Sequence, residues 1–385
     1  MMEEPTSGEK VAGSEDLTAE IFIRLPANSL ALCKWVSKQW LSLITSPTFI
    51  KKHTLTYPPL LSGLFLIPRQ PGQSHKIHSL SLNQTKPSFP FVDFLNYRGL
   101  EIIHACKGLL ICYSQSEMTH YVCNPTTRQL RQLHSCPYLR NDEFALNLVF
   151  DPLRSPNYKV VCLQKVDGQE SNYKIAIYSS ETGVWSLSEE PFFVPDDVEF
   201  KDGVSCNNAI HWLKNTVSGL YLDLNNTEML QEMPELPRRD EVEVSQYKFK
   251  YFGKSKDYLF YIISRPLLNY YEIYQMKEDY SGWDLKSRLN LNVLVTKYPS
   301  IARHFGFHPL FSEYECDVLS VVHSGDEDED EDLEVVLSIP GEVVTFNLKK
   351  KTSTEMHDPV FRPSDVTIWY KTHSVYEYFE TLSLV

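Results

Sequence analysis

Few residues of this chain have the type and spacing that chemistry requires. His304 and His308 are four residues apart, a spacing that would place two metal ligands on one face of a helix. Gly306 and Pro309 disfavour a helix in this segment. On a strand, the two histidines would be too far apart without a third ligand between them. We therefore expect no metal site here.

The candidates for catalysis are equally weak. His211, beside Trp212, has the side chain of a general base, but a hairpin histidine packed beneath an aromatic ring is the preferred interpretation. The sequence contains no phosphate-binding, dinucleotide-binding, serine-hydrolase or zinc-protease motif. No cysteine has the signature of a ubiquitin-transferring or protease nucleophile. We predict no catalytic residue, no cofactor and a protein that is not an enzyme.

The cysteines favour a structural interpretation. They form no C-x-x-C pair, and most have strand-like apolar neighbours, which predicts reduced, buried core residues in a reducing compartment. The eight are Cys33, Cys106, Cys112, Cys123, Cys136, Cys162, Cys206 and Cys316.

Charge and hydropathy narrow the class of partner. The 385 residues include 37 Lys and Arg against 50 Asp and Glu, a net charge of −13, which argues against a nucleic-acid partner. No segment approaches 18 consecutive apolar residues, and the first ten residues lack the apolar core of a signal peptide. We expect a soluble protein of the nucleus and/or cytoplasm, with no membrane partner.

Seven consecutive carboxylates occupy residues 326–332, within a predicted acidic loop of residues 324–332. Because they repel one another, we expect a solvated, mobile loop between two strands, Val322 and Leu333 lying in the strand-like runs on either side. Two interpretations stay open: a solubilising insertion, or an acidic lip that attracts a basic partner.

Two amphipathic helices are predicted near the N-terminus. Ser14 is a plausible N-cap of the first, Leu17, Ile21 and Leu25 repeat every four residues along it, and Pro26 ends it. Ser29 is a plausible N-cap of the second helix. An apolar stripe then follows that helix: Leu30, Cys33, Val36, Trp40 and Ile44.

The second helix carries more apolar surface than packing on one core requires. Leu32, Trp35 and Leu43 lie outside its main stripe, whereas an apolar arc of roughly 100° suffices for one contact. The excess favours a second partner. A helix buried within a larger helical subdomain is the alternative.

Beyond residues 57–59 the sequence changes to short β-branched and aromatic runs separated by turn residues, which predicts an all-β domain. A run–turn–run pattern recurs six times at intervals of 42, 55, 44, 53 and 71 residues, near Leu82, Asn124, Ser179, Asp223, Met276 and Asn347. This spacing predicts an irregular β-propeller of about six blades, with an insertion in the longest interval and residues 370–385 closing the domain. An antiparallel sandwich is the alternative.

The N-terminal segment resembles the F-box of plant F-box proteins. Sixteen positions match in order: Leu17, Glu20, Ile21, Arg24, Leu25, Pro26, Ser29, Leu30, Val36, Ser37, Lys38, Trp40, Leu43, Ile44, Pro47 and Phe49. Four residues at three sites depart from the family pattern. Gly13-Ser14 replaces the opening Leu-Pro, Cys33 an aromatic residue, and Trp35 a cysteine.

Two later motifs resemble the plant F-box-associated domain. Residues 106–110 (CKGLL) and 121–128 (YVCNPTTR) are similar to its opening signature, with Lys107 in place of the usual Asn. Residues 207–212 (NNAIHW) are similar to a second signature, with Asn208 in place of Gly. Because Asn tolerates positive φ, we expect the tight turn at Asn208 to survive.

Together the resemblances imply an α+β multidomain chain. A three-helix F-box would occupy residues 10–55, and a propeller-like recognition domain residues 56–385. The implied function is target recognition in a Skp, cullin and F-box ubiquitin ligase, which would bind a Skp-type adaptor, through it cullin, and a target protein. Eight residues would form the adaptor surface or the F-box core: Leu17, Ile21, Leu25, Pro26, Leu30, Val36, Trp40 and Ile44.

Two alternatives remain at the level of function. The first is an F-box-like protein that binds targets without recruiting a ligase, because Gly13-Ser14 departs from the family pattern. The second is an enzyme built on the propeller, which would require polar or metal-binding residues that converge at one mouth of the central channel.

Overall fold

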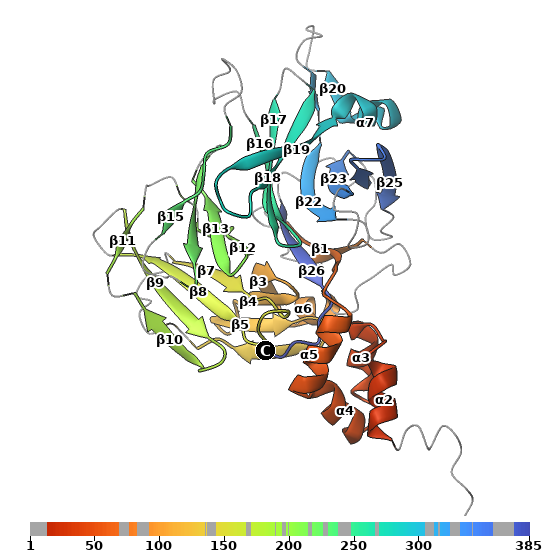
Figure 1. Cartoon of the computed structure of the whole chain (residues 1–385), viewed down its shortest axis with the longest axis vertical. Coiled ribbons are helices and arrows are strands. Elements are labelled where there is room, and N and C mark those ends of the chain that lie inside the picture. The colour runs from red at the N-terminus through yellow and green to blue at the C-terminus, as the bar shows by residue number, and fades with distance from the viewer. Residues whose placement is uncertain are drawn as a thin grey trace, which may run out of the picture.

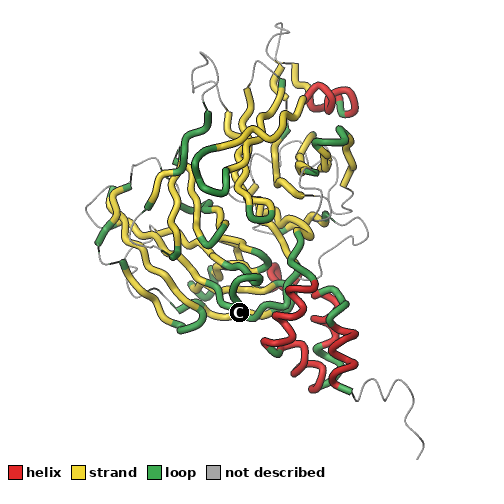
Figure 2. Tube along the Cα trace, viewed as in Figure 1, coloured by secondary structure: helices red, strands yellow, loops and turns green. Residues whose placement is uncertain are grey.

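The computed structural model comprises a helical domain of residues 15–56 and a β-propeller of residues 61–379 (Figures 1 and 2). The structure describes residues 14–68, 77–82, 92–134, 136, 144–166, 171–188, 190–194, 198, 200–214, 218–225, 230–237, 248–265, 269–304, 312–314, 316–323, 332–340, 342–356 and 373–385.

Local capping sets the ends of the N-terminal helices. The helices are α2 (Glu15–Phe22), α3 (Ala27–Cys33), α4 (Lys38–Thr45) and α5 (Pro47–Thr56). The predicted cap at Ser14 is confirmed, since its hydroxyl accepts from Leu17 N at 3.5 Å. Ser46 caps α5 in the same way, with Phe49 N at 3.2 Å, and Pro47 occupies the first turn, where a missing N–H costs nothing.

The middle helix differs from the prediction in two respects. Ser29 is not an N-cap, because α3 begins after Pro26, whose fixed φ suits the start of a helix. The predicted single helix is divided, because Ser37 is extended and its hydroxyl accepts from Trp40 N at 3.1 Å, which starts α4 afresh. The three-helix architecture is confirmed with its middle helix in two pieces.

The propeller has six antiparallel blades. The innermost strands of neighbouring blades contact one another around the propeller axis. The strands of each blade are given from the innermost outwards. Blade 1 has β26 (His373–Phe379), β1 (Leu61–Pro68) and β2 (His78–Ser81). Blade 2 follows α6 (Val92–Tyr97) and has β3 (Leu100–Cys106), β4 (Leu109–Ser114), β5 (Thr119–Asn124) and β6 (Gln129–Gln132). Blade 3 has β7 (Phe144–Val149), β8 (Lys159–Lys165), β9 (Asn172–Ser179), β10 (Val184–Leu187) and the short β11 (Phe192–Phe193).

The other three blades have four strands each. Blade 4 has β12 (Val204–Cys206), β13 (Ala209–Leu213), β14 (Gly219–Asp223) and β15 (Gln231–Glu232). Blade 5 has β16 (Lys248–Ser255), β17 (Tyr258–Arg265), β18 (Tyr270–Met276) and β19 (Trp283–Asn290). Blade 6 has β22 (Asp317–His323), β23 (Leu333–Ile339), β24 (Glu342–Asn347) and β25 (Thr352–Met356).

The predicted insertion lies between blades 5 and 6. It contains α7 (Leu291–Lys297), the 3₁₀ turn η2 (Pro299–Ile301), β20 (Ala302–His304) and β21 (Ser312–Tyr314). This segment accounts for the longest of the five repeat intervals. The propeller prediction is therefore confirmed, and the sandwich alternative is wrong.

The recurring sequence pattern corresponds to the turn between the third and fourth strands of a blade. Five of the six predicted positions fall there, namely Asn124, Ser179, Asp223, Met276 and Asn347. The sixth, Leu82, directly follows β2, and the segment after it lies outside the described residues.

Side-chain acceptors and left-handed residues shape these turns. The side-chain oxygens of Asn124, Asp223 and Asn347 accept backbone N–H groups two or three residues later, at 2.8–2.9 Å. In four of the turns, the residue four positions after the predicted repeat position has φ between 55° and 74°. These residues are Arg128, Gly183, Tyr280 and Lys351. The repeat is thus a repeat of turn geometry.

Apolar clusters hold the blades together. Within the described residues, one cluster fills each interface between neighbouring blades, including the interface between blades 6 and 1. Trp212 lies between blades 3 and 4, and Tyr378 lies between blades 1 and 2, both fully buried. Each blade therefore buries both faces of its sheet against its neighbours.

The C-terminal strand closes the ring, as predicted. β26 pairs with β1 along its whole length, so the first and last strands of the propeller share one sheet. Ser320 Oγ on β22 then donates to Glu377 Oε1 at 2.9 Å, which joins the last blade to the first. This closure leaves no open edge between the chain ends.

Residues 380–385, here termed the C-terminal strap, continue from β26 to the helical domain (Figure 1). Leu382 is 1% exposed and belongs to the same apolar cluster as Leu30 and Ile44 of the helices. Asn28 Nδ2 also donates to Glu380 Oε1 at 3.1 Å. The strap therefore connects the two domains through the core of one of them.

Candidate functional site

The N-terminal helices leave large apolar side chains exposed. Leu32 on α3 is 70% exposed, and Trp35, in the turn that follows α3, is 87% exposed. The full set of exposed large apolar residues on the helices and their turns up to Thr45 is Leu17, Ile21, Leu32, Trp35, Val36 and Leu41. Burying such side chains against a partner is favourable, so this surface is a candidate docking face.

The structure sorts the eight predicted residues into two groups. Leu30 and Ile44 are fully buried in the helical core, and Leu25 and Trp40 are half-buried against it. The other four, Leu17, Ile21, Pro26 and Val36, are exposed. The periodic stripe on the predicted second helix did not distinguish these groups, because the turn before Ser37 rotates α4 relative to α3.

The turn between α2 and α3 is held by two side chains from the end of α5. Pro26 stops α2, which leaves carbonyl groups without intrahelical partners. Tyr57 donates its hydroxyl to Arg24 O at 2.9 Å, and His53 Nε2 donates to Leu25 O at 2.8 Å. Burial lowers the pKa of His53, which keeps the ring neutral in this role. Two side-chain hydrogen bonds thus fix the chain between the first two helices.

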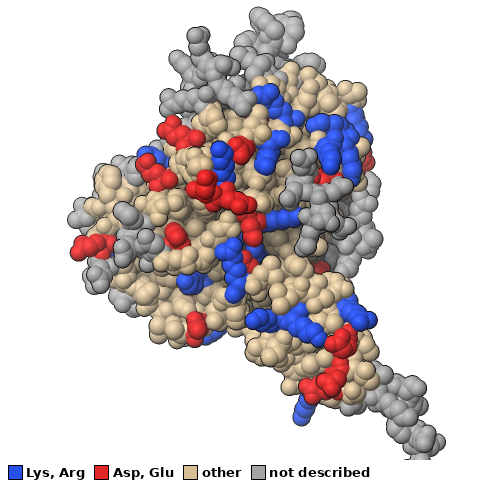
Figure 3. Space-filling model, viewed as in Figure 1, with Lys and Arg blue, Asp and Glu red and all other residues tan. Residues whose placement is uncertain are grey.

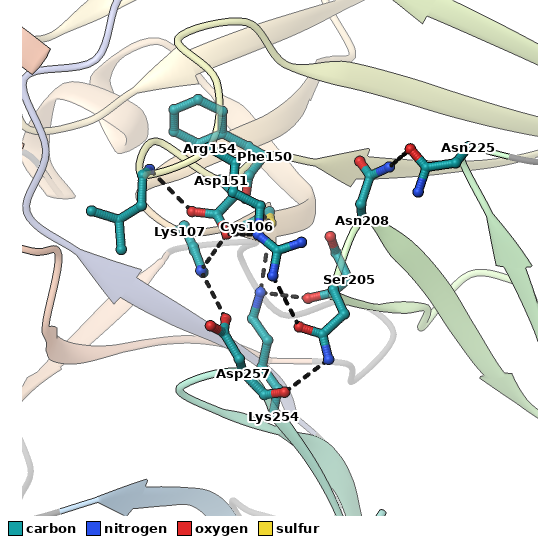
Figure 4. Close-up of polar contacts among 12 residues, drawn as sticks. Cys106, Lys107, Phe150, Asp151, Arg154, Ser205, Asn208, Asn225, Lys254 and Asp257 are labelled. Carbon is teal, nitrogen blue, oxygen red and sulfur yellow. Dashed lines mark hydrogen bonds and ion pairs between the residues drawn. The ribbon is translucent and has the colours of Figure 1, made fainter. Parts of the chain in front are cut away.

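The second candidate site is polar and lies at one mouth of the propeller channel. Lys107, in the turn between β3 and β4, reaches Asp151 at 3.0 Å and Asp257 at 3.4 Å, so three blades meet at one ammonium group (Figure 4). Arg154 Nε lies 3.4 Å from Asp151. These residues line a cavity of about 280 Å³. Basic and acidic side chains are intermixed over the middle of the face seen in Figure 3.

Two tight turns build this mouth. Lys107 and Gly108 have φ of 41° and 93°, and Asn207 and Asn208 have φ of 50° and 58°. A Cβ at Gly108 would lie 2.5 Å from Thr381 Cγ2 and 2.7 Å from Phe379 O, so this turn requires glycine and packs against the start of the strap. The prediction that Asn208 adopts positive φ is confirmed.

The first family-like motif has a role that its turn propensity did not reveal. Asn124 uses its oxygen for its own turn, while its Nδ2 donates to Thr381 O at 3.1 Å and to Ser383 O at 2.7 Å. Thr126 Oγ1 accepts from Thr381 N at 3.3 Å. The motif therefore holds the C-terminal strap, a long-range contact with no signal in the local sequence.

His211 has the structural role that the sequence predicted. Its Nδ1 lies 3.0 Å from Val204 O, and its Nε2 lies 2.7 Å from the Tyr280 hydroxyl. The ring stacks between Tyr221 and Tyr280, and burial lowers its pKa to about 4. His211 is therefore a neutral core residue.

The other chemical candidates show no assembled site. No group of three metal-ligating side chains occurs among the described residues. His304 lies in β20, and His308 lies outside the described residues, as do six of the seven carboxylates. The seventh, Asp332, is an exception to the predicted solvated run, because its carboxylate lies 3.1 Å from Lys350 Nζ and its side chain is little exposed.

Seven of the eight cysteines are buried, as predicted, and Cys33 is half-buried. Burial raises the pKa of the Cys206 thiol, at the mouth, to about 11. Cys106, nearby, donates its thiol to Phe150 O at 3.2 Å. The raised pKa argues against Cys206 as an activated nucleophile.

Comparisons with known proteins agree with this architecture. The family model of the F-box associated beta propeller domain matches residues 70–256. F-box protein At5g07610 of Arabidopsis thaliana is 30% identical over 376 residues, which cover 90% of this chain and 86% of that protein. This chain is an F-box protein.

Other relatives match over shorter spans. Putative F-box protein At3g17490 of Arabidopsis thaliana is 32% identical over 182 residues, 44% of this chain and 46% of that protein. F-box/kelch-repeat protein At3g17530 of the same plant is 26% identical over 212 residues, 52% of this chain and 54% of that protein.

The departures of this F-box protein from its family pattern now have places in the fold. Gly13 lies outside the described residues, and Ser14 caps α2. Trp35 lies in the turn between α3 and α4 and points a large ring to solvent.

Among the described residues, no helix has the length and hydropathy needed to cross a bilayer.

Proposed function

We propose that this F-box protein is the target-recognition subunit of a Skp, cullin and F-box ubiquitin ligase. The helical domain binds a Skp-type adaptor, and through it cullin, while the propeller holds a target protein. The protein supplies no bond-making residue; it raises the effective concentration of a target lysine near the ubiquitin-conjugating enzyme. The proposed location is the nucleus and/or cytoplasm.

One observation carries this proposal. The F-box helices and turns up to Thr45 expose six large apolar side chains, including Trp35, while the same segment contributes to a closed core. An isolated domain gains nothing from that arrangement, whereas an adaptor that covers the face removes apolar surface from water. The family membership supplies the class of partner.

Charge substitutions on the exposed face test the proposal. Binding of the purified chain to a plant Skp-type adaptor is measured by titration calorimetry for the wild type, Ile21→Asp and Trp35→Asp. Both side chains are exposed, so the substitutions leave the fold intact, and each is expected to weaken adaptor binding by about tenfold or more. Leu30 and Ile44 are unsuitable for this test, because a charge at either buried position would unfold the domain.

Val184→Asp is the matched control. Val184 is a comparably exposed apolar residue on β10 of the propeller, so its substitution should leave adaptor affinity within about twofold of the wild type. Equal affinity of all four proteins for the adaptor would contradict the proposed docking face. Failure of the wild type to bind any such adaptor would support the alternative of a target-binding protein that recruits no ligase.

A propeller enzyme is the second candidate, because polar residues do converge at the mouth. It has less support: the two aspartates there are ion-paired, and burial raises the pKa of the nearby Cys206 thiol. Turnover of a small molecule by the purified chain, abolished by Asp151→Asn, would favour it over the ligase subunit.

A further inference from the structure

The mouth cavity contains a buried cation, Lys254, that has no carboxylate of the described residues within ion-pair distance. Lys254 on β16 is 9% exposed, and its Nζ donates to Ser205 O at 2.5 Å and lies 3.8 Å from Cys106 Sγ. Within the described part of the chain, no carboxylate oxygen forms an ion pair with this ammonium. A buried ammonium in this state is ready to accept an anionic ligand.

The carboxylates of the mouth are already engaged by other cations. Asp151 contacts Lys107 and Arg154, and Asp257 contacts Lys107. The lining as a whole contains five basic and three acidic side chains, in a chain whose net charge is −13. Lys254 and the exposed Lys256 therefore remain as excess positive charge.

Glu377, the carboxyl group further along the channel, interacts electrostatically with Lys254, but the two form none of the ion pairs found among the described residues. Glu377 on β26 lines the adjoining part of the channel with Lys254, and its Oε1 accepts from Ser320. Burial raises the pKa of Glu377, which disfavours its charged form. The nearby charge of Lys254 acts in the opposite direction, so Glu377 is an electrostatic neighbour of Lys254 without an ion pair to it.

Amide groups line the same cavity. Asn208 Nδ2 donates to Asn225 Oδ1 at 3.0 Å (Figure 4). Asn207 Nδ2 donates to Asp257 O at 3.0 Å. A side-chain amide has two donor hydrogens and two acceptor lone pairs, so it can pair with a peptide backbone as well as with a neighbour. The three asparagines and Lys254 all line this cavity.

We propose that the mouth cavity binds an anionic group, a carboxylate or a phosphate, carried on a peptide segment of the target. Lys254 provides the counter-charge, Lys256 adds charge at the rim, and the asparagines contact the peptide backbone. This inference rests on the proposed function, since it takes the propeller as the target-binding domain. A cavity of about 280 Å³ accommodates one acidic side chain with its backbone.

The position of the cavity suits this role. Lys107 lines the mouth, and the neighbouring Gly108 packs against Thr381 of the C-terminal strap. The strap carries Leu382 into the F-box core. The mouth therefore lies at the end of the propeller that meets the F-box, so a peptide anchored there is held near the adaptor-binding domain.

Three end-blocked, fluorescein-labelled heptapeptides test the proposal with the full chain and no adaptor. They share one neutral sequence and differ only at the central residue, which is Asp, phosphoserine or Ser. Fluorescence anisotropy is expected to show at least about tenfold tighter binding of an anionic peptide than of the Ser peptide, with the preference falling as salt rises. Preference for phosphoserine alone identifies phosphate as the ligand; similar affinity for Asp identifies a carboxylate.

Substitutions of Lys254 separate ligand binding from folding. Lys254→Met is expected to abolish the anion preference, and Lys254→Arg to restore most of it. Lys248→Met, on the same strand but outside the cavity lining, is the control and should bind as the wild type. If Lys254→Met fails to fold, Lys256→Glu at the rim is expected to reduce anion binding several-fold.

Equal binding of the three peptides, no binding of any of them up to about 1 mM, or a retained preference in folded Lys254→Met would overturn the proposal. Because the adaptor is absent from this assay, its outcome is independent of the adaptor titration. A chain that prefers the anionic peptide but binds no adaptor would separate the two claims.

Discussion

At the scale of residues, two buried histidines illustrate how the ring of blades depends on neutral side chains. His104 Nε2 donates to Gly203 O at 2.7 Å, and its Nδ1 accepts from Leu148 N at 3.2 Å, which joins blades 2, 3 and 4. His211 bridges blades 4 and 5 through Tyr280. Burial lowers the pKa of each from 6.5 to about 4, so both rings are neutral in the native protein at neutral pH.

These shifts predict a pH dependence of stability. Between pH 6.5 and 4, the unfolded chain protonates each histidine while the native chain does not, so the stabilisation is complete above pH 6.5 and is lost as the pH falls towards 4. His211→Gln keeps an amide for the Val204 and Tyr280 contacts but does not titrate. In urea unfolding across this range, the slope of unfolding free energy against pH should be smaller in the variant by about 1.4 kcal/mol per pH unit. Identical slopes would mean that His211 is accessible to protons in the native state.

At the scale of elements, the C-terminal strap is the least expected feature. The aromatic residues before it predicted a closing strand, and β26 is that strand. The strap that follows has no periodicity, and its contacts with Asn124 and with the F-box core join residues more than 250 positions apart. Such contacts are set by tertiary packing, which one sequence does not display.

The strap is predicted to stabilise the F-box helices specifically. Leu382→Ala leaves a cavity in the helical core, and such a substitution typically costs about 2–5 kcal/mol. Hydrogen exchange should therefore accelerate in α3 and α4 while the strands of blades 3 to 5 keep their protection. Leu384→Ala, a change of the same size at a partly exposed position of the strap, should leave exchange unaltered. Exchange rates in α3 and α4 that do not respond to Leu382→Ala would refute the role of the strap.

The same scale shows how much of the fold was predictable. Asn124 and Asn347 mark turns because their own side chains accept backbone N–H groups, a local effect that a sequence displays directly. The division of the middle F-box helix at Ser37 was missed, because its apolar stripe continued through the turn. The mouth site was missed for a different reason: Lys107, Asp151 and Lys254 come from three blades, and only closure of the ring brings them together.

At the scale of the whole molecule, residues 373–385 have two roles: they close the propeller ring and they attach the F-box to it. β26 completes blade 1, and the strap then fixes the F-box against the propeller. A target held at the mouth and an adaptor held on the F-box would accordingly keep a set separation, which is what catalysis by proximity requires.

The most direct test of the central claim is assembly of the purified chain with a Skp-type adaptor and the adaptor-binding portion of a cullin. Size-exclusion chromatography with light scattering is expected to show a single complex containing one copy of each protein. The same mixture with Trp35→Asp should separate into free F-box protein and an adaptor–cullin complex. Elution of the wild-type chain alone, at its monomer mass of 44.6 kDa, would contradict the account.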